Sequence, residues 1–195
     1  MIDTYRTLAS PGEFRQKIGR SDFLAVAIPV TSEAAFFAEL DRRSKRHFDA
    51  THHCWAFRLF LERRARSADA GEPSGTAGRP ILSAIEGAEL FDVAVIVSRW
   101  FGGVKLGTGG LSRAYRHTAA AALREAPAVP RFLYDRFSVL VPFDRIGEAY
   151  RLVEPPDVLL AEEKYGEVNE FSFDVRRSMR ERFLNALAAR RLTLQ

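Results

Sequence analysis

Apolar side chains repeat with two different periods along the first part of the chain. The run Phe23–Pro29 is almost wholly apolar and contains β-branched residues, which is typical of a buried strand. Thr31 or Ser32 then offers a side-chain oxygen to the start of a helix, whose buried stripe includes Phe36 and Leu40. The pattern therefore predicts a strand followed by an amphipathic helix.

Two more strands and a longer helix are predicted further along. The strands are expected at Cys54–Leu61 and Val93–Ser98, with a loop rich in glycine and proline between them. A second glycine-rich loop follows, and the next helix is expected to open at about Gly110. Its apolar positions recur at helical spacing: Leu111, Ala114, Tyr115, Thr118, Ala122 and Leu123.

The last third of the chain has a pattern of its own. Apolar residues alternate with others at Phe137–Val141 and again at Phe171–Val175, while Met179, Phe183 and Leu187 recur at every fourth position. With a helix at 144–153, a strand at 158–165 and a short strand at 192–195, the order is β-α-β-β-α-β. A ferredoxin-like split unit is the fold that fits this order most simply.

A change of composition separates these two parts. Residues Ala126–Pro130 contain two prolines, each of which removes a hydrogen-bond donor and pushes the residue before it toward an extended conformation. The sequence therefore predicts an α+β protein with one domain at residues 1–126 and a ferredoxin-like domain at 131–195.

The composition is that of an ordinary globular protein, with 47% apolar and 28% charged residues among 195. The longest uncharged stretch, Phe23–Ser32, falls far short of the ~20 residues that a membrane-spanning helix needs. The first residues do not have the basic-then-apolar order of a secretory signal, and the single Cys54 fits a reducing compartment. We expect a cytoplasmic protein with no membrane association.

Basic residues are gathered in the first part of the chain. The net charge is +4, and residues 130–195 contribute none of this excess. Two clusters stand out, and each is either a solvated face or a contact for a polyanion. The first also suits the C-terminal end of a helix dipole. Their members are Arg42, Arg43, Lys45 and Arg46, and then Arg63, Arg64 and Arg66.

The two glycine-rich loops offer a candidate anion site. They read DAGEPSGTAGRP at Asp69–Pro80 and RWFGGVKLGTGG at Arg99–Gly110. Glycines let several backbone N–H groups converge on one anion, and the second loop runs into a helix N-terminus. The candidate anion- or nucleic-acid-binding residues are Arg79, Arg99, Lys105, Gly109, Gly110 and Arg113.

A purely structural interpretation of the same loops competes with the anion site. The glycines would then make tight turns and let a helix pack closely on a sheet. Neither loop fits a known nucleotide-binding fingerprint. Arg99 distinguishes the two hypotheses, because a guanidinium buried against Asp69 or Glu72 would be a structural strut.

Three stretches together resemble the YigZ/IMPACT family: HHCWAF, DAGEPSGTAGRP and VIVSRWFGGVKLGTGGLSRAY, through residues 52 to 115. The resemblance implies a first domain with the fold of the second domain of ribosomal protein S-five, shared with domain IV of elongation factor G. It implies a second domain similar to domain V of that factor. The motif residues without an assigned role are His52, His53, Asp69, Glu72, Ser74, Thr76, Trp100, Phe101, Gly102 and Gly103.

The same residues offer several catalytic arrangements. His52, His53 and Cys54 invite a metal, but neighbouring residues on a strand point to opposite faces. Cys54 with a histidine suggests a thiol nucleophile, and Ser74 with His53 and Glu72 a hydrolytic triad, although no accompanying signature supports either. Asp69 and Glu72 are candidates for an acid–base pair, and loop closure or helix capping is the more common use of such residues. We expect no metal and no cofactor.

Three functions remain open from the sequence. The leading hypothesis is a non-catalytic binding protein that contacts RNA, the ribosome or another translation component through the glycine loops. Trp100 and Phe101, beside Arg99, are candidates for stacking on bases. The alternatives are an enzyme acting on a small phosphorylated or anionic substrate in the same groove, and a protein-interaction factor that binds no nucleic acid.

Overall fold

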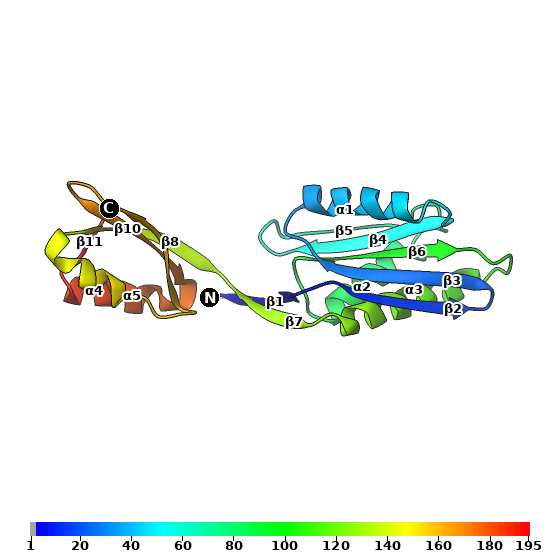
Figure 1. Ribbon diagram of the computed structural model, residues 1–195. Coiled ribbons are helices and arrows are strands. Elements are labelled where there is room, and N and C mark those ends of the chain that lie inside the picture. Colours follow the sequence, from blue (N-terminus) through cyan, green and yellow to red (C-terminus); the bar gives the residue numbers. More distant parts are fainter. Residues whose placement is uncertain (1–2) are drawn as a thin grey trace. The chain divides into compact units, whose positions relative to one another are not determined.

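The computed structural model describes residues 3–195 and divides the chain into two compact units (Figure 1). One unit is Arg6–Pro130, and the other contains Arg131–Gln195 together with the described residues up to Tyr5. Strands β1 (Thr4–Leu8) and β7 (Ala128–Phe132) pair in a two-stranded sheet, so each contributes residues to both units. The residues expected to form a linker therefore lie partly in a paired strand.

The first unit is built on a five-stranded antiparallel sheet in the order β2-β3-β6-β4-β5. Helix α1 covers one face of the sheet, and helices α2 and α3 lie on the other (Figure 1). Their bounds are β2 Gly12–Ile18, β3 Ser21–Pro29, α1 Glu33–Arg46, β4 His52–Leu59, β5 Arg64–Ala68, α2 Gly78–Gly87, β6 Val93–Trp100 and α3 Gly107–Glu125.

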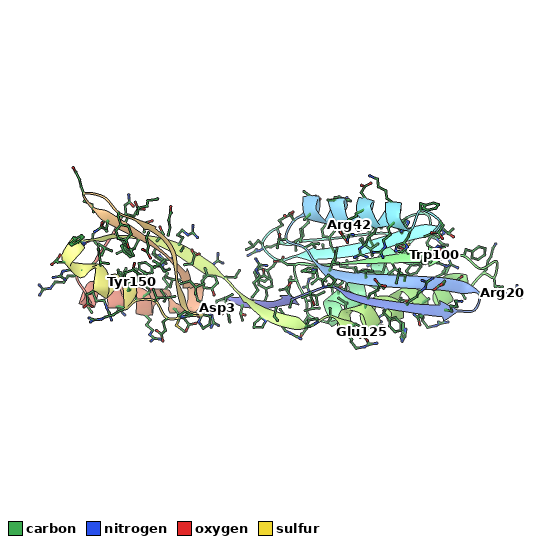
Figure 2. The ribbon with its side chains drawn as sticks, in the orientation of Figure 1. Asp3, Arg20, Arg42, Trp100, Glu125 and Tyr150 are labelled. Atoms are coloured by element: carbon green, nitrogen blue, oxygen red, sulfur yellow. The ribbon has the colours of Figure 1, made fainter. Side chains whose placement is uncertain are left out.

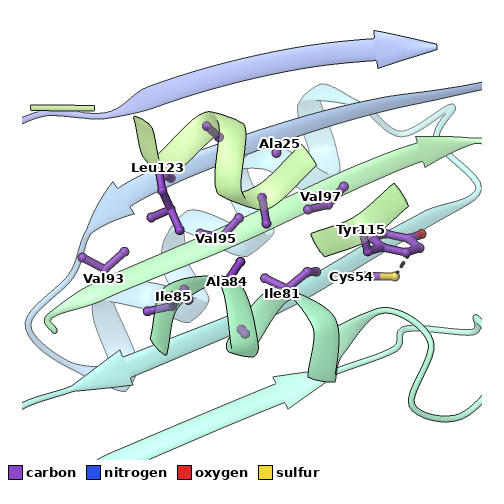
Figure 3. Close-up of a cluster of buried hydrophobic side chains, with 14 of the residues drawn as sticks. Ala25, Cys54, Ile81, Ala84, Ile85, Val93, Val95, Val97, Tyr115 and Leu123 are labelled. Atoms are coloured by element: carbon purple, nitrogen blue, oxygen red, sulfur yellow. Dashed lines mark hydrogen bonds between the residues drawn. The ribbon is translucent and has the colours of Figure 1, made fainter. Parts of the chain in front are cut away.

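Both faces of the central strands are buried, which explains why their sequences are continuously apolar. On β6, Val95 and Val97 join the cluster beneath α2 and α3, whereas Ile96 packs on the opposite face with Phe36 of α1. Figure 3 shows the larger cluster, in which side chains of the two helices meet those of the sheet. The helix expected after Pro29 is present, and the Ser32 hydroxyl accepts a hydrogen bond from the Ala35 amide at 3.2 Å.

The structure corrects the sequence-based description of this unit in two places. The segment expected to be a loop between β4 and β6 contains the edge strand β5 and all of α2. Helix α3 begins at Gly107, about one turn before the expected Gly110. Strands β2 and β5 lie at the edges of the sheet, where alternate or nearly all side chains are exposed, so neither shows a long apolar run.

The second unit has the ferredoxin-like fold that the pattern predicted. Its antiparallel sheet has the order β11-β8-β10-β9, and its core contains Val139, Phe171, Phe173 and Phe183. The elements are β8 Tyr134–Val141, the 3₁₀ turn Phe143–Arg145, α4 Ile146–Tyr150, β9 Val158–Lys164, β10 Asn169–Arg176, the 3₁₀ turn Arg177–Met179, α5 Arg180–Ala189 and β11 Thr193–Leu194. The chain is thus a two-domain α+β protein.

Candidate functional site

The two glycine loops meet at one end of the first unit and enclose an open cleft of about 400 Å³. The cleft lies where β6 ends and α3 begins. Its walls come from segments far apart in the sequence: Thr51, His52, Gly71, Glu72, Pro73, Arg99, Phe101, Lys105, Leu106, Gly107, Thr108 and Leu111. Of the candidate anion-binding residues, only Arg99 and Lys105 are among them.

Glycine is required in the second loop for two separate reasons. A Cβ at Gly102 would lie 1.8 Å from the backbone oxygen of Arg20, so only glycine lets the loop pass the β2–β3 turn. Gly103 and Gly107 have φ values of +85° and +70°, which side chains disfavour. These glycines therefore shape the loop whether or not a ligand binds, as the structural interpretation expected.

The start of α3 gives the cleft a positive end. Leu106 occupies the N-cap position, and no side chain caps the helix there. The first amides of a helix lack intrahelical acceptors, and the helix dipole places partial positive charge at them. Lys105 is exposed beside these amides and also lines the cleft.

Arg99 has a structural role in the cleft wall, which argues against its prediction as an anion-binding residue. Its guanidinium donates to Oε1 of Glu72 at 2.6 Å and to the Ser21 hydroxyl at 3.0 Å. The two charged side chains are 5% and 3% exposed, so water screens the ion pair little. The charge of Arg99 is neutralised within the protein, so the anion-site hypothesis has to depend on other cations.

Glu72 also accepts a hydrogen bond from a tyrosine on α3. The Tyr115 hydroxyl donates to the same Oε1 atom at 2.7 Å, and the Cys54 thiol donates to the Tyr115 oxygen at 3.3 Å (Figure 3 shows this last contact). Burial, together with the nearby carboxylates of Glu72 and Asp69, raises the pKa of Cys54 to about 12. The thiol is therefore protonated near neutral pH, which excludes the role of thiolate nucleophile in this state.

Asp69 caps helix α2 from outside the helix. Its carboxylate accepts hydrogen bonds from the amides of Gly75, Ala77 and Gly78 at 2.8, 2.9 and 2.9 Å. Burial acts to raise the pKa of Asp69, but these three hydrogen bonds outweigh it and lower the pKa. The structure supports loop closure and helix capping for Asp69, rather than a role in an acid–base pair.

The two histidines lie on opposite faces of β4, as strand geometry predicts. His52 lines the cleft, with Nδ1 2.9 Å from the Ala70 oxygen and Nε2 3.9 Å from Glu72. His53 instead pairs with Ser98 at 2.9 Å, and burial lowers its pKa. The alternative triad of Ser74, His53 and Glu72 is therefore not assembled.

The remaining motif residues support the loops or lie outside the cleft. The Thr76 hydroxyl donates to the Pro73 oxygen at 2.6 Å and closes a turn, while Ser74 is exposed. Arg79 and Arg113 are exposed but do not line the cleft, and neither do Gly109 and Gly110. Within residues 3–195, no group of three or more histidine, cysteine or acidic side chains is arranged to hold a metal ion.

Aromatic side chains are accessible at this end of the unit. Phe101 is 45% exposed, and its amide donates to the Thr51 hydroxyl at 3.0 Å, which fixes the backbone beneath the ring. Trp100, labelled in Figure 2, is half-buried, with the Arg15 guanidinium 5.3 Å from the centre of its ring. Phe48, just beyond α1, is 85% exposed.

Carboxylates pair with several members of both basic clusters but neutralise only part of their charge. On α1, Glu39 pairs with Arg42 and Arg43, and Asp41 pairs with Lys45. Glu33 pairs with Arg64 and Arg66 of β5. Because Glu39 and Glu33 are each shared by two arginines, both clusters keep a positive excess, and both the solvated-face and the polyanion interpretations stay open.

The sequence did not reveal the hydrogen bond between Tyr115 and Glu72. The sequence pattern places Tyr115 only in a buried helix stripe, yet a buried tyrosine hydroxyl needs a partner. That requirement was the signal that could have linked α3 to the first glycine loop.

Comparison with known proteins places this architecture in a described class: one unit with a cleft between two glycine loops, and a second unit with a ferredoxin-like fold. Residues 19–123 match the Impact N-terminal domain, and the chain belongs to the IMPACT family. An IMPACT family member of Thermus thermophilus is 46% identical over 148 residues, covering 76% of this chain and 79% of that protein. YvyE of Bacillus subtilis, another member, is 33% identical over 172 residues, or 88% of this chain and 79% of YvyE.

A solved structure has the same fold along the whole chain. The crystal structure of a hypothetical protein superposes with a TM-score of 0.73 at 24% identity, covering 100% of this chain and 97% of the other. The resemblance noted from the glycine motifs is thus confirmed for family and fold. Among the described residues, no helix is both long enough and apolar enough to cross a membrane.

Proposed function

We propose that this protein binds RNA, or an RNA surface of the ribosome, through the cleft at the start of α3, and that this binding links it to translation. The observation that carries the proposal is the convergence of an uncapped helix N-terminus, the free cation of Lys105 and the half-exposed ring of Phe101. Lys105 has no ion-pair partner among the described residues, and the one carboxylate in the cleft wall is already paired with Arg99.

Each component suits a different part of a nucleotide. Helix amides and a lysine attract a phosphate, and an exposed aromatic ring stacks on a base of any identity. The recognition expected is therefore of single-stranded RNA with little sequence preference. The family resemblance adds support, since it relates the first domain to domains of ribosomal protein S-five and elongation factor G.

Fluorescence anisotropy with a labelled single-stranded RNA tests the proposal. Lys105→Ala should weaken binding and make the slope of log K against log salt shallower by about 0.7, because one phosphate contact is lost. Phe101→Ala should cost about 1–3 kcal/mol if the ring stacks on a base. Both side chains are exposed, so neither change should disturb the fold.

Arg42→Ala is the matched control, because Arg42 is paired with Glu39 and lies on α1, which covers the face of the sheet opposite α3. Its affinity should equal that of the wild type. RNA affinity that does not depend on salt, or that survives both cleft substitutions, would contradict the proposal. Capture of a partner that nuclease treatment leaves unchanged would favour a protein-interaction role instead.

A further inference from the structure

A second cavity lies in the first unit, away from the cleft at the start of α3. It measures about 470 Å³ and is bordered by the C-terminal halves of α2 and α3. Its apolar lining includes Ala84, Ala88, Leu90, Ala120 and Leu123. We call this cavity the α2–α3 groove.

The groove is hollow because the helices present small side chains along it. Gly87 lines it, and a Cβ added there would have no heavy atom within 4 Å. Cavities of about 150 Å³ are large enough to hold a benzene molecule, so a groove of 470 Å³ has room for several apolar side chains. Apolar side chains of a partner would therefore fit into this open space.

Three arginines surround this apolar floor. Arg6, Arg116 and Arg124 line the groove and are exposed, and none has an ion pair or side-chain hydrogen bond within residues 3–195. The lining contains no carboxylate; the acidic residues of the two helix ends, Glu86, Glu89 and Glu125, are exposed outside it. The C-terminal dipoles of two helices offset only about one of the three positive charges.

We propose that the α2–α3 groove binds an acidic amphipathic helix of a partner protein. Leucine-like side chains of the helix would occupy the floor, and its carboxylates would pair with the three arginines. The α3 residues that line the groove run from Arg116 to Arg124, a rise of about 12 Å, which matches roughly two turns of a bound helix. The lining has no aromatic residue on which a nucleic-acid base could stack, so an acidic protein segment fits better than RNA.

Labelled synthetic helices test this proposal on the full chain. The probe is a peptide of about 14 residues with leucines on one face and glutamates elsewhere. Two companion peptides replace either every glutamate with lysine or every leucine with serine. The acidic amphipathic peptide should bind, and both companions should bind at least about ten-fold more weakly.

Variants of the groove assign the binding to this surface. Gly87→Phe places a ring in the open space and should weaken peptide binding at least about ten-fold. Arg116→Ala and Arg124→Ala should each weaken it about two- to five-fold, with less effect at high salt. Arg46→Ala is the matched control, since Arg46 is exposed on α1, on the opposite face of the sheet.

Each remaining outcome overturns the proposal. The groove does not bind such a helix if the acidic peptide shows no binding at about 1 mM, or if the lysine peptide binds equally well. The same conclusion follows if affinity is unchanged in Arg116→Ala, Arg124→Ala and a correctly folded Gly87→Phe. Loss of RNA binding in Gly87→Phe and Arg116→Ala, with peptide binding intact, would make the groove a nucleic-acid surface instead.

Discussion

Replacing Arg99 with alanine should destabilise the first unit strongly, because the substitution leaves Glu72 buried without its cation. The two side chains are 5% and 3% exposed and lie 2.6 Å apart, so bulk water can replace neither partner. Breaking such a pair costs about 3–5 kcal/mol. For a chain of this size, that corresponds to a melting temperature lower by about 6–20 °C.

Urea unfolding followed by tryptophan fluorescence measures this effect directly, since both tryptophans, Trp55 and Trp100, lie in the first unit. Glu72→Gln should be similarly destabilising, because it leaves the Arg99 charge buried. The double variant Arg99→Met with Glu72→Gln should lose much less than the sum of the two single changes, since no uncompensated charge remains. The reasoning is refuted if Arg99→Ala unfolds within about 0.5 kcal/mol of the wild type while its RNA affinity falls; Arg99 would then be a binding residue.

Three further outcomes follow from the same site. In urea unfolding, Gly102→Ala should destabilise the protein more than Gly103→Ala. The new Cβ at position 102 would lie 1.8 Å from the Arg20 backbone, whereas at position 103 it would only be strained by a positive φ. Equal losses of stability would contradict this. Asp69→Asn should lower the free energy of unfolding by its largest amount above the ordinary aspartate pKa of 3.8, and by less as the pH falls further, because the pKa of Asp69 is lowered in the folded protein. A loss of stability that does not change with pH would contradict this. With its pKa raised to about 12, Cys54 should react with a disulfide reagent at pH 8 only as fast as the protein opens, and rapid labelling of the native state would oppose this.

The buried strands could be predicted because their faces pack against helices on both sides. Phe23–Pro29 and Val93–Ser98 are apolar on successive residues for that reason, and local sequence carries the signal. The edge strands β2 and β5 carry no comparable signal because they alternate or expose most side chains. The ferredoxin-like unit could be predicted from the order of its patterns.

The parts of the site that could not be predicted depend on contacts between distant residues. Helix α2 has no capping side chain at its own start, and Asp69 supplies the hydrogen bonds from nine positions earlier. The ion pair of Arg99 and Glu72 joins residues 27 positions apart, and the contact from Tyr115 spans 43. The sequence named Glu72 as one acceptor for Arg99, but only the fold determined that it is used.

The shared oxygen of Glu72 has a dynamic consequence for the cleft. This oxygen joins the first glycine loop to β6 through Arg99 and to α3 through Tyr115. None of these three segments can therefore move away from the cleft without breaking a buried hydrogen bond. Hydrogen exchange in the three segments should therefore proceed through one cooperative opening rather than through separate loop motions. A ligand would meet walls that folding has already ordered, and binding would lose little conformational entropy there.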